Sequence, residues 1–386
     1  MSVLWWILPA GLLWAVIVLL PWRPWGTRER LDADPREPEA DSSDVVVLIP
    51  ARNEAVVLAR TLHALARQGR GLAVVVVDDQ SSDGTAGIAA RSDSLPVTVV
   101  HGRPVPDGWT GKVWALEQGR PYLHRPLTLL LDADIELAPG MVPALRRQLR
   151  RSGAGMVSVM AQLPMDGWWE RLLVPAFVYF FKLLYPFGLS PAPRSRVAAA
   201  AGGCVLLETG ALDAIGGFGA LRDALIDDCR LARLVKARGC RPWIGLTRSA
   251  RSTRSRSGLG DIWHMVSRTA YTQLGYAPSM LLLCTLLMVT AFLLPVAGLF
   301  APSGADKTLA AAVCAAMVST YVPTLRFYGL APVWALSLPL SGALYLAMTW
   351  SSAARYWRGE RSRWKGRVYR ASPCAEDGPD SDNAVV

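Results

Sequence analysis

The stretch 129–134 (LLLDAD) constrains the fold more than any other, because three leucines run directly into two carboxylates that stand one residue apart. Such an apolar run predicts the end of a β-strand buried on both faces, as in a parallel sheet. Residues i and i+2 of a strand point to the same side, so Asp132 and Asp134 would face one crevice at the carboxyl edge of the sheet. Paired hard oxygen ligands suit Mg²⁺ or Mn²⁺ bound together with a phosphate. A solvated turn at the strand end is the alternative.

The composition predicts a folded domain joined to membrane segments. At 52% hydrophobic residues and a mean hydropathy of +0.25 the chain is too apolar for an ordinary soluble enzyme, yet 19% charged residues are too many for a membrane bundle alone. The net charge of +10 comes from basic residues near apolar segments, which favours anionic lipid over nucleic acid as the partner. The six cysteines form no CxxC pair, so we expect reduced thiols in the cytosol.

Both ends of the chain carry apolar segments. Residues 3–22 lack charge and are flanked by tryptophans, which predicts a transmembrane anchor rather than a cleaved signal peptide, since the start is not basic. Arginines follow this segment, so the positive-inside rule places the N-terminus outside and the next domain in the cytoplasm. We expect two or three spans within 279–350, where 308–325 is the weakest. Either that segment does not cross, or the basic tail of 351–386, disordered at its end, breaks the rule.

Strand and helix patterns alternate between the two apolar ends. The β-branched runs 45–49 and 73–77 each precede a polar loop and a helix, and 97–100 precedes a helix from Val113 to about Tyr122. This alternation predicts an α/β domain with a parallel sheet and right-handed crossovers. The acidic residues that follow its strands are Glu54, Asp78, Asp79, Asp132 and Asp134. Their common place at one sheet edge favours a functional site over solvated turns.

Other phosphate-binding classes fit less well. The aspartates after 73–77 are similar to those of isoprenoid synthases, but those lie on helices, whereas four consecutive valines indicate a strand. Neither a Walker A sequence nor a GxGxxG after a strand occurs, which argues against ATP hydrolysis and a Rossmann site.

Three motifs in order, 47–54 (VLIPARNE), 77–85 (VDDQSSDGT) and 132–134 (DAD), resemble the nucleotide-sugar motifs of inverting glycosyltransferases of family 2. The resemblance implies an α/β domain of GT-A fold over 45–277, with a mixed, mainly parallel sheet. The resemblance implies that Asp132 approaches the ribose or sugar and that Asp134 ligates Mg²⁺ or Mn²⁺. The residues implied to line the nucleotide site are Pro50, Ala51, Glu54, Asp78 and Asp79. Lys112, before a helix, is an expected phosphate or ribose contact, with a solvated lysine as the alternative.

The pair Asp227-Asp228 precedes a helical pattern and by itself indicates only favourable charges at a helix start. In the family a Glu-Asp pair at this place carries the general base, so the resemblance implies that Asp228 deprotonates the acceptor hydroxyl. Membrane-linked members carry a QxxRW motif, of which this chain keeps only Arg268, implied to contact the diphosphate. The basic stretch 248–256 is expected to face lipid phosphates.

The order of anchor, GT-A domain, the stretch 268–274 and C-terminal spans resembles the hopene-associated glycosyltransferases of bacterial hopanoid gene clusters. The resemblance implies a multi-pass enzyme of the bacterial inner (cytoplasmic) membrane, with a cytoplasmic catalytic domain. It would transfer a sugar from a nucleotide-sugar donor, expected to be UDP-linked, to a hopanoid. Polyprenyl phosphate or another membrane lipid is the alternative acceptor, and a non-catalytic scaffold is a further alternative. The aromatic segment 168–189 contains Pro175, Lys182 and Pro186, which interrupt it and predict a poor transmembrane helix. It would instead be a membrane-surface helix that guides the acceptor, or a buried core helix.

Overall fold

The computed structural model describes residues 4–34, 41–92, 95–255, 258–365 and 367–370. The chain forms two compact units. The sheet unit consists of Arg28–Pro164 and Phe187–Ser255, and the helical unit of Met1–Thr27, Met165–Pro186 and Arg256–Val386. The chain therefore passes from one unit to the other more than once.

An eight-stranded sheet, in the order β3-β2-β1-β4-β7-β6-β8-β5, organises the sheet unit. Its strands are β1 (Val45–Ala51), β2 (Ala73–Asp78), β3 (Val97–His101), β4 (Leu127–Leu131), β5 (Ile135–Leu137), β6 (Met156–Gln162), β7 (Cys204–Glu208) and β8 (Pro242–Ser252). The pairs β1-β2, β1-β4, β2-β3 and β6-β8 are parallel, whereas β4-β7, β6-β7 and β5-β8 are antiparallel. The expected mixed, mainly parallel sheet is confirmed.

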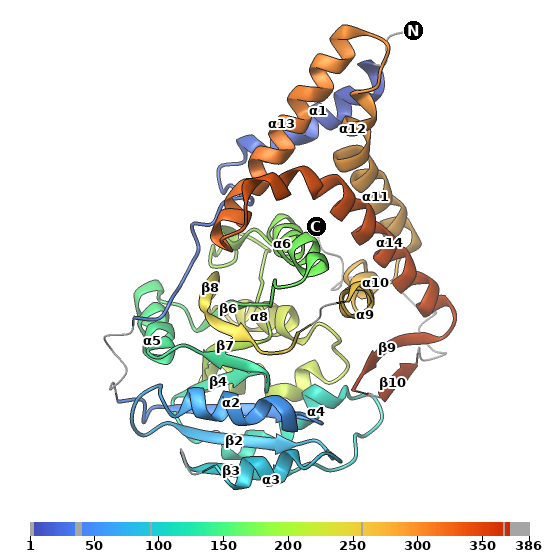
Figure 1. The fold of residues 1–386 in the computed structure, drawn as a ribbon. Coiled ribbons are helices and arrows are strands. Elements are labelled where there is room, and N and C mark those ends of the chain that lie inside the picture. Colours follow the sequence, from blue (N-terminus) through green and yellow to red (C-terminus); the bar gives the residue numbers. More distant parts are fainter. Residues whose placement is uncertain (1–3, 35–40, 93–94, 256–257, 366, 371–386) are drawn as a thin grey trace. The chain divides into compact units, whose positions relative to one another are not determined.

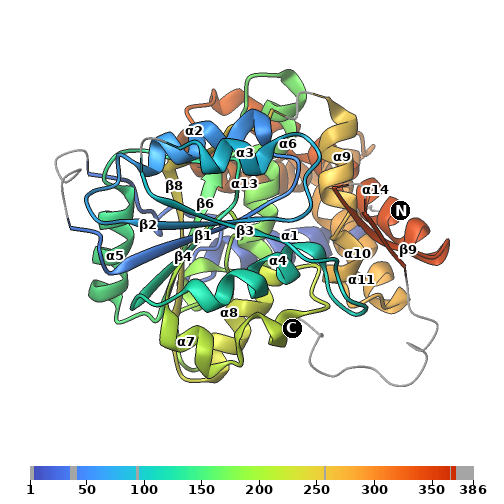
Figure 2. The same cartoon turned by 90° about the horizontal axis from the view of Figure 1, so that it is seen from below.

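Helices cover both faces of this sheet, which explains why its central strands β1, β2 and β4 are mostly apolar and buried. All seven residues of β1 are buried. Val45, Val47 and Ile49 pack into one core, which includes residues of α2, and Val46 and Leu48 into another, which includes residues of α4 and α8. Figure 2 shows α2 and α3 on one side of the sheet and α4 on the other. The helices are α2 (Ala55–Leu65), α3 (Thr85–Ala90), α4 (Gly111–Gly119), α5 (Met141–Ser152), α7 (Thr209–Ala214) and α8 (Asp227–Ala237).

The helical unit has its own core of aromatic and aliphatic side chains. Its helices are α1 (Leu4–Leu19), α6 (Trp168–Leu184), α9 (Leu259–Ser267), α10 (Ala270–Gln273), α11 (Pro278–Met288), α12 (Leu294–Gly298), α13 (Gly304–Phe327) and α14 (Leu338–Trp357). Helix α1 lies beside α13, as Figure 1 shows. A two-stranded hairpin of β9 (Glu360–Trp364) and β10 (Arg367–Arg370) follows α14.

Within the described residues, four helical segments are long and apolar enough to cross a membrane: 168–189, 278–298, 304–327 and 332–357. Segment 304–327 is longer than the expected 308–325, and its 24 residues exceed the roughly 20 that a bilayer core requires. Helix α1 has 16 residues and falls short of that length, so the anchor over 3–22 stays a prediction. The expected disordered end of the tail lies outside the described residues.

Segment 168–189 differs from the expectation, because a mid-segment lysine and a proline do not interrupt it. Helix α6 runs through Pro175 to Leu184. The ammonium of Lys182 is buried and donates to the carbonyl oxygen of Gly26 at 2.9 Å and to Thr324 Oγ1 at 2.9 Å. A buried cation with hydrogen-bond acceptors around it is tolerated inside an apolar unit, so the sequence pattern underestimated this helix.

Helix α4 packs closely against Leu48 of β1 at Gly119, and this contact can be tested by substitution. A Cβ at Gly119 would lie 2.3 Å from Leu48 Cδ1, whereas a Cβ at Gly210 in α7 would meet nothing within 4 Å. Leu48 is fully buried, so any shift of its side chain disturbs a close-packed core. We expect Gly119→Ala to lower the free energy of unfolding by about 1–3 kcal/mol through overpacking. The control Gly210→Ala should be neutral or slightly stabilising, because alanine favours helices. Thermal unfolding of the purified chain measures both, and equal behaviour would contradict the contact.

Candidate active site

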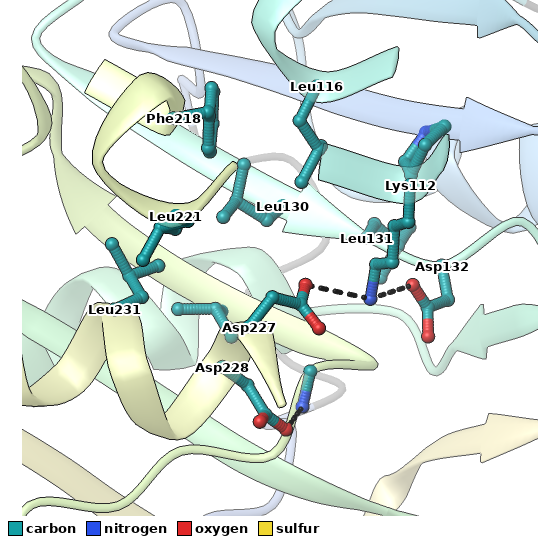
Figure 3. A pocket seen from close by; sticks show the side chains of 13 residues that line it. Lys112, Leu116, Leu130, Leu131, Asp132, Phe218, Leu221, Asp227, Asp228 and Leu231 are labelled. Atoms are coloured by element: carbon teal, nitrogen blue, oxygen red, sulfur yellow. Dashed lines mark hydrogen bonds and ion pairs between the residues drawn. The ribbon is translucent and has the colours of Figure 1, made fainter. Parts of the chain in front are cut away.

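A pocket at the carboxyl edge of the sheet brings together four charged side chains from three elements of the sheet unit. Lys112 lies in the first turn of α4, Asp132 directly follows β4, and Asp227 and Asp228 open α8. Figure 3 shows Lys112 between the carboxylates of Asp227 and Asp132. The pocket is also lined by Pro50, Leu116, Leu130, Leu131, Gly202, Val205, Phe218, Leu221 and Leu231. The pocket therefore combines a cluster of charged side chains with a mainly apolar lining.

Lys112 joins two of these carboxylates. Its Nζ lies 3.0 Å from Asp132 Oδ1 and 3.4 Å from Asp227 Oδ2. Burial alone would lower the pKa of Lys112, but the charges of Asp132 and Asp227 outweigh burial and raise it. The ammonium therefore stays charged at any physiological pH. Lys112 pairs with two acids in a pocket, which differs from the alternative of a lysine in contact with solvent alone.

Asp228 is held differently from its neighbour. Its Oδ2 accepts the Gly202 N–H at 2.8 Å, and its Oδ1 accepts the Cys229 N–H at 2.7 Å. Burial, with the charge of Asp227 next, raises the pKa of Asp228 to about 6. A Cβ at Gly202 would lie 3.2 Å from Asp228 Oδ2, so the glycine keeps the backbone close to this carboxyl group. A carboxyl group that titrates near neutral pH suits proton transfer.

The loops after β1 and β2 bind each other, which brings the first two motifs together. Asp79 N donates to the carbonyl oxygen of Ala51 at 2.7 Å, and Asn53 N donates to Ser81 Oγ at 3.0 Å. Asp79 is fully buried, and Arg52 lies 4.0 Å from its carboxylate.

Asp78, at the end of β2, carries an unsatisfied polar atom. Its Oδ1 is buried without a hydrogen-bond partner among the described residues. A buried acceptor of this kind costs about 1–3 kcal/mol unless a donor reaches it. The atom is therefore suited to accept a hydrogen bond from a ligand.

Glu54 and Asp134 share a partner that the sequence did not reveal. Arg254 forms an ion pair with Glu54 through Nη2, and its Nε lies 3.4 Å from Asp134 Oδ2. The same Asp134 oxygen accepts a hydrogen bond from Ser252 Oγ at 2.9 Å. The expectation of a lipid-facing loop over 248–256 is wrong for Arg254. Strand β8 pairs with β5, with Ile135 opposite Ser252, and so brings Arg254 to the acids.

Arg268 follows α9 in the helical unit, where its side chain is exposed. Its contact with a diphosphate stays a prediction.

The carboxylates fit a divalent cation that is only partly coordinated by protein. Asp134 Oδ2 has protein partners, but no described contact engages Oδ1. In the part of the chain that the structure describes, no three His, Cys, Asp or Glu side chains gather around a common metal position. Mg²⁺ commonly takes one or two carboxylates and completes its shell with water and substrate phosphates. The chemistry of this site therefore fits a cation that arrives with a diphosphate.

Comparison with known proteins agrees with this geometry. A family model described as glycosyltransferase like family 2 matches residues 42–268, which is more than half of the chain. The chain belongs to glycosyltransferase family 2. The matched range contains the sheet unit's strands and each residue of the pocket.

Two curated relatives of this family 2 glycosyltransferase match it over shorter stretches. The 4,4'-diaponeurosporenoate glycosyltransferase of Staphylococcus haemolyticus is 32% identical over 110 residues, 28% of this chain and 29% of the relative. The undecaprenyl-phosphate 4-deoxy-4-formamido-L-arabinose transferase of Edwardsiella ictaluri is 32% identical over 135 residues, 33% of this chain and 40% of the relative. The matches span less than half the length of either relative.

A solved structure extends the likeness of fold along most of the chain. The mannosyltransferase from Pyrobaculum calidifontis, in complex with GDP-Man and Mn²⁺, superposes with a TM-score of 0.52. The alignment covers 90% of this chain and 99% of that protein at 18% identity. At this identity the likeness concerns the fold alone, and it confirms the expected GT-A fold.

The raised pKa of Asp228 predicts a pH-dependent stability effect. The folded chain holds this proton up to about pH 6, whereas the ordinary pKa is 3.8, so ionisation costs stability as the pH rises through that window. We expect Asp228→Asn, which cannot ionise, to be more stable than the wild type at pH 8 by an amount of order 1–3 kcal/mol. The gain should shrink at pH 5. Thermal unfolding at both pH values measures it.

Asp213→Asn, which removes a carboxylate that is 57% exposed, is the control for a change of charge alone. A stability gain for Asp228→Asn that is the same at pH 5 and pH 8 would contradict the raised pKa.

Proposed function

We propose that the chain is a membrane-bound inverting glycosyltransferase that moves a sugar from a nucleotide-sugar donor, UDP-linked, to the hydroxyl group of a hopanoid. The observation that carries the proposal is the pocket itself: a carboxyl group with a pKa of about 6, Asp228, beside the Lys112–Asp132 ion pair in a family 2 domain. The protein would lie in the bacterial inner membrane, with its catalytic domain in the cytoplasm.

In the proposed reaction Asp228 takes the proton of the acceptor hydroxyl. The acceptor oxygen attacks the anomeric carbon from the face opposite the diphosphate, and the bond from that carbon to the diphosphate oxygen breaks. The nucleoside diphosphate leaves with the electron pair, so the configuration inverts. A divalent cation bound at Asp134 would supply positive charge for the diphosphate.

Other residues would bind and orient the donor. Asp78 offers its unpaired oxygen, and Asp79 is fixed against the loop after β1. Lys112 would reach phosphate or ribose, because its ammonium lies at the same edge as Asp132. The remaining proposed donor contacts are Pro50, Ala51, Glu54 and Arg268.

A lipid acceptor is supported by the helical unit and by the relatives. Four described segments are apolar and long enough to cross a membrane. The two relatives are named for diaponeurosporenoate and undecaprenyl phosphate as acceptors. The second name favours polyprenyl phosphate, or another membrane lipid, as the alternative to a hopanoid. A scaffold without activity would not need Lys112 and Asp228 assembled in one pocket.

Lipid profiling tests the acceptor and the base together. We expect the wild-type chain, produced in a hopanoid-making bacterium that lacks its own gene, to add a hexose- or hexosamine-sized mass to a hopanoid. Asp228→Asn should lose this product by at least about 100-fold, since a positioned base contributes roughly that factor. Mass spectrometry of total lipids measures both. A sugar on another lipid would support the alternative acceptor, and no change with membrane-inserted protein would overturn the proposal.

The pH profile of the rate tests the role of Asp228 separately. A base must be ionised, and because its pKa is about 6, activity should fall as the pH drops through 6. The charge of Asp227 contributes to the raised pKa, so Asp227→Asn should move the acid limb to lower pH. Initial rates between pH 5 and 8 with a fixed donor concentration measure the shift. An unchanged acid limb would assign the titration to another group.

A further inference from the structure

The positively charged side chain of Arg254 lies beside two acids at the edge of the sheet, Glu54 and Asp134. Its guanidinium pairs with Glu54 and lies 3.4 Å from Asp134, and its side chain is 36% exposed. Glu54 and Asp134 are far more buried, at 10% and 13% exposed. The guanidinium therefore covers two buried carboxylates from the solvent side.

Hydrogen bonds hold the backbone of residues 253 and 254 beside Asp134. Thr253 N donates to the carbonyl oxygen of Asp134 at 2.8 Å, directly after the pairing of Ser252 with Ile135. Arg254 N in turn donates to Ser252 Oγ, the hydroxyl that holds Asp134 Oδ2. These hydrogen bonds hold the backbone beside Asp134, and from there the Arg254 guanidinium reaches both acids.

Asp134 is also the residue that the family resemblance implies as the ligand of the divalent cation. The guanidinium of Arg254 and the cation would therefore compete for the Asp134 carboxylate. A positive charge beside Asp134 weakens the binding of a second one, because like charges repel at this distance. A diphosphate at the site changes the balance, since a guanidinium binds phosphate oxygens with two parallel hydrogen bonds. Once Arg254 turns to phosphate, Asp134 is released for the cation.

We propose that Arg254 is a positioning residue that couples cation binding to donor binding: it pairs with Glu54 and Asp134 in the donor-free protein and exchanges Asp134 for the diphosphate when the donor enters. This inference rests on the proposed nucleotide-sugar function. By reciprocity, the cation and the nucleotide strengthen each other's binding by the same factor, and Arg254 enlarges that factor.

Binding titrations on the full chain in detergent test this coupling without measuring activity. The dissociation constant of Mn²⁺ is determined by electron paramagnetic resonance, alone and with saturating UDP or GDP, and that of each nucleotide by calorimetry without metal. For Arg254→Gln we expect Mn²⁺ alone to bind about fivefold tighter. The nucleotide alone should bind about tenfold weaker, because a charge-assisted contact is lost. The gain in Mn²⁺ affinity on adding nucleotide should shrink accordingly.

Two further variants keep the result interpretable. Arg251→Gln removes the same charge three residues earlier, in β8, but Arg251 is exposed and its Nε donates to the carbonyl oxygen of Arg248 rather than to an acid. It should match the wild type within about twofold, since a remote exposed charge is screened. Arg254→Lys keeps the charge but loses the guanidinium geometry, so we expect a coupling between those of the wild type and Arg254→Gln. This variant also tests the proposal if Arg254→Gln does not fold.

The outcomes separate the two proposals. Unchanged Mn²⁺ affinity in both Arg254 variants would overturn the role of Arg254, whatever the nucleotide does. A wild type that binds Mn²⁺ but neither UDP nor GDP would count against the nucleotide-sugar function, while the Mn²⁺ comparison would still decide whether Arg254 competes for Asp134. An equal effect of Arg251→Gln would assign the change to overall charge and reject the specific contact.

Discussion

The ammonium group of Lys112 sits between the carboxylates of Asp132 and Asp227, and the acidic edge of the sheet depends on this pairing. Carboxylates gathered in a partly buried pocket repel one another and lose hydration, so some would take up protons without a nearby cation. Lys112 offsets this repulsion for Asp132 and Asp227. Asp228 instead accepts two backbone N–H groups, and burial together with the charge of Asp227 raises its pKa to about 6. Burial also raises the pKa of Asp132.

The sheet explains how residues so distant in sequence meet. Parallel strands β1, β2 and β4 all end at one edge, and the loops that follow them carry the acidic motifs. The antiparallel strand β7 returns beside β4 and sets Gly202 next to Asp228. Helices α4 and α8 then direct Lys112 and Asp228 toward the strand end. The two basic side chains come from different elements: Lys112 from the start of α4 and Arg254 from the segment after β8. Lys112 pairs with Asp132, and Arg254 pairs with Glu54.

The local sequence pattern predicted much of this arrangement. It failed where the position of a residue depends on contacts between segments distant in the sequence. The buried runs of β1, β2 and β4 and the acids after them follow from continuous apolar stretches. Arg254 was missed because its place depends on β5 pairing with β8, more than a hundred residues apart, which no local spacing encodes. Helix α6 was underestimated because the partners of Lys182 come from distant segments.

In the sequence, α6 of the helical unit stands between the two segments of the sheet unit, and this order has a consequence for biosynthesis. Strands β4 and β6 precede this apolar helix in the chain, and their partners β7 and β8 follow it. During translation the sheet therefore remains open until the ribosome has produced α6 and released the segment beyond it. The sheet is thus completed only after a helix long and apolar enough to cross a membrane has been made. No single cut at either end of the chain yields the sheet unit without that helix.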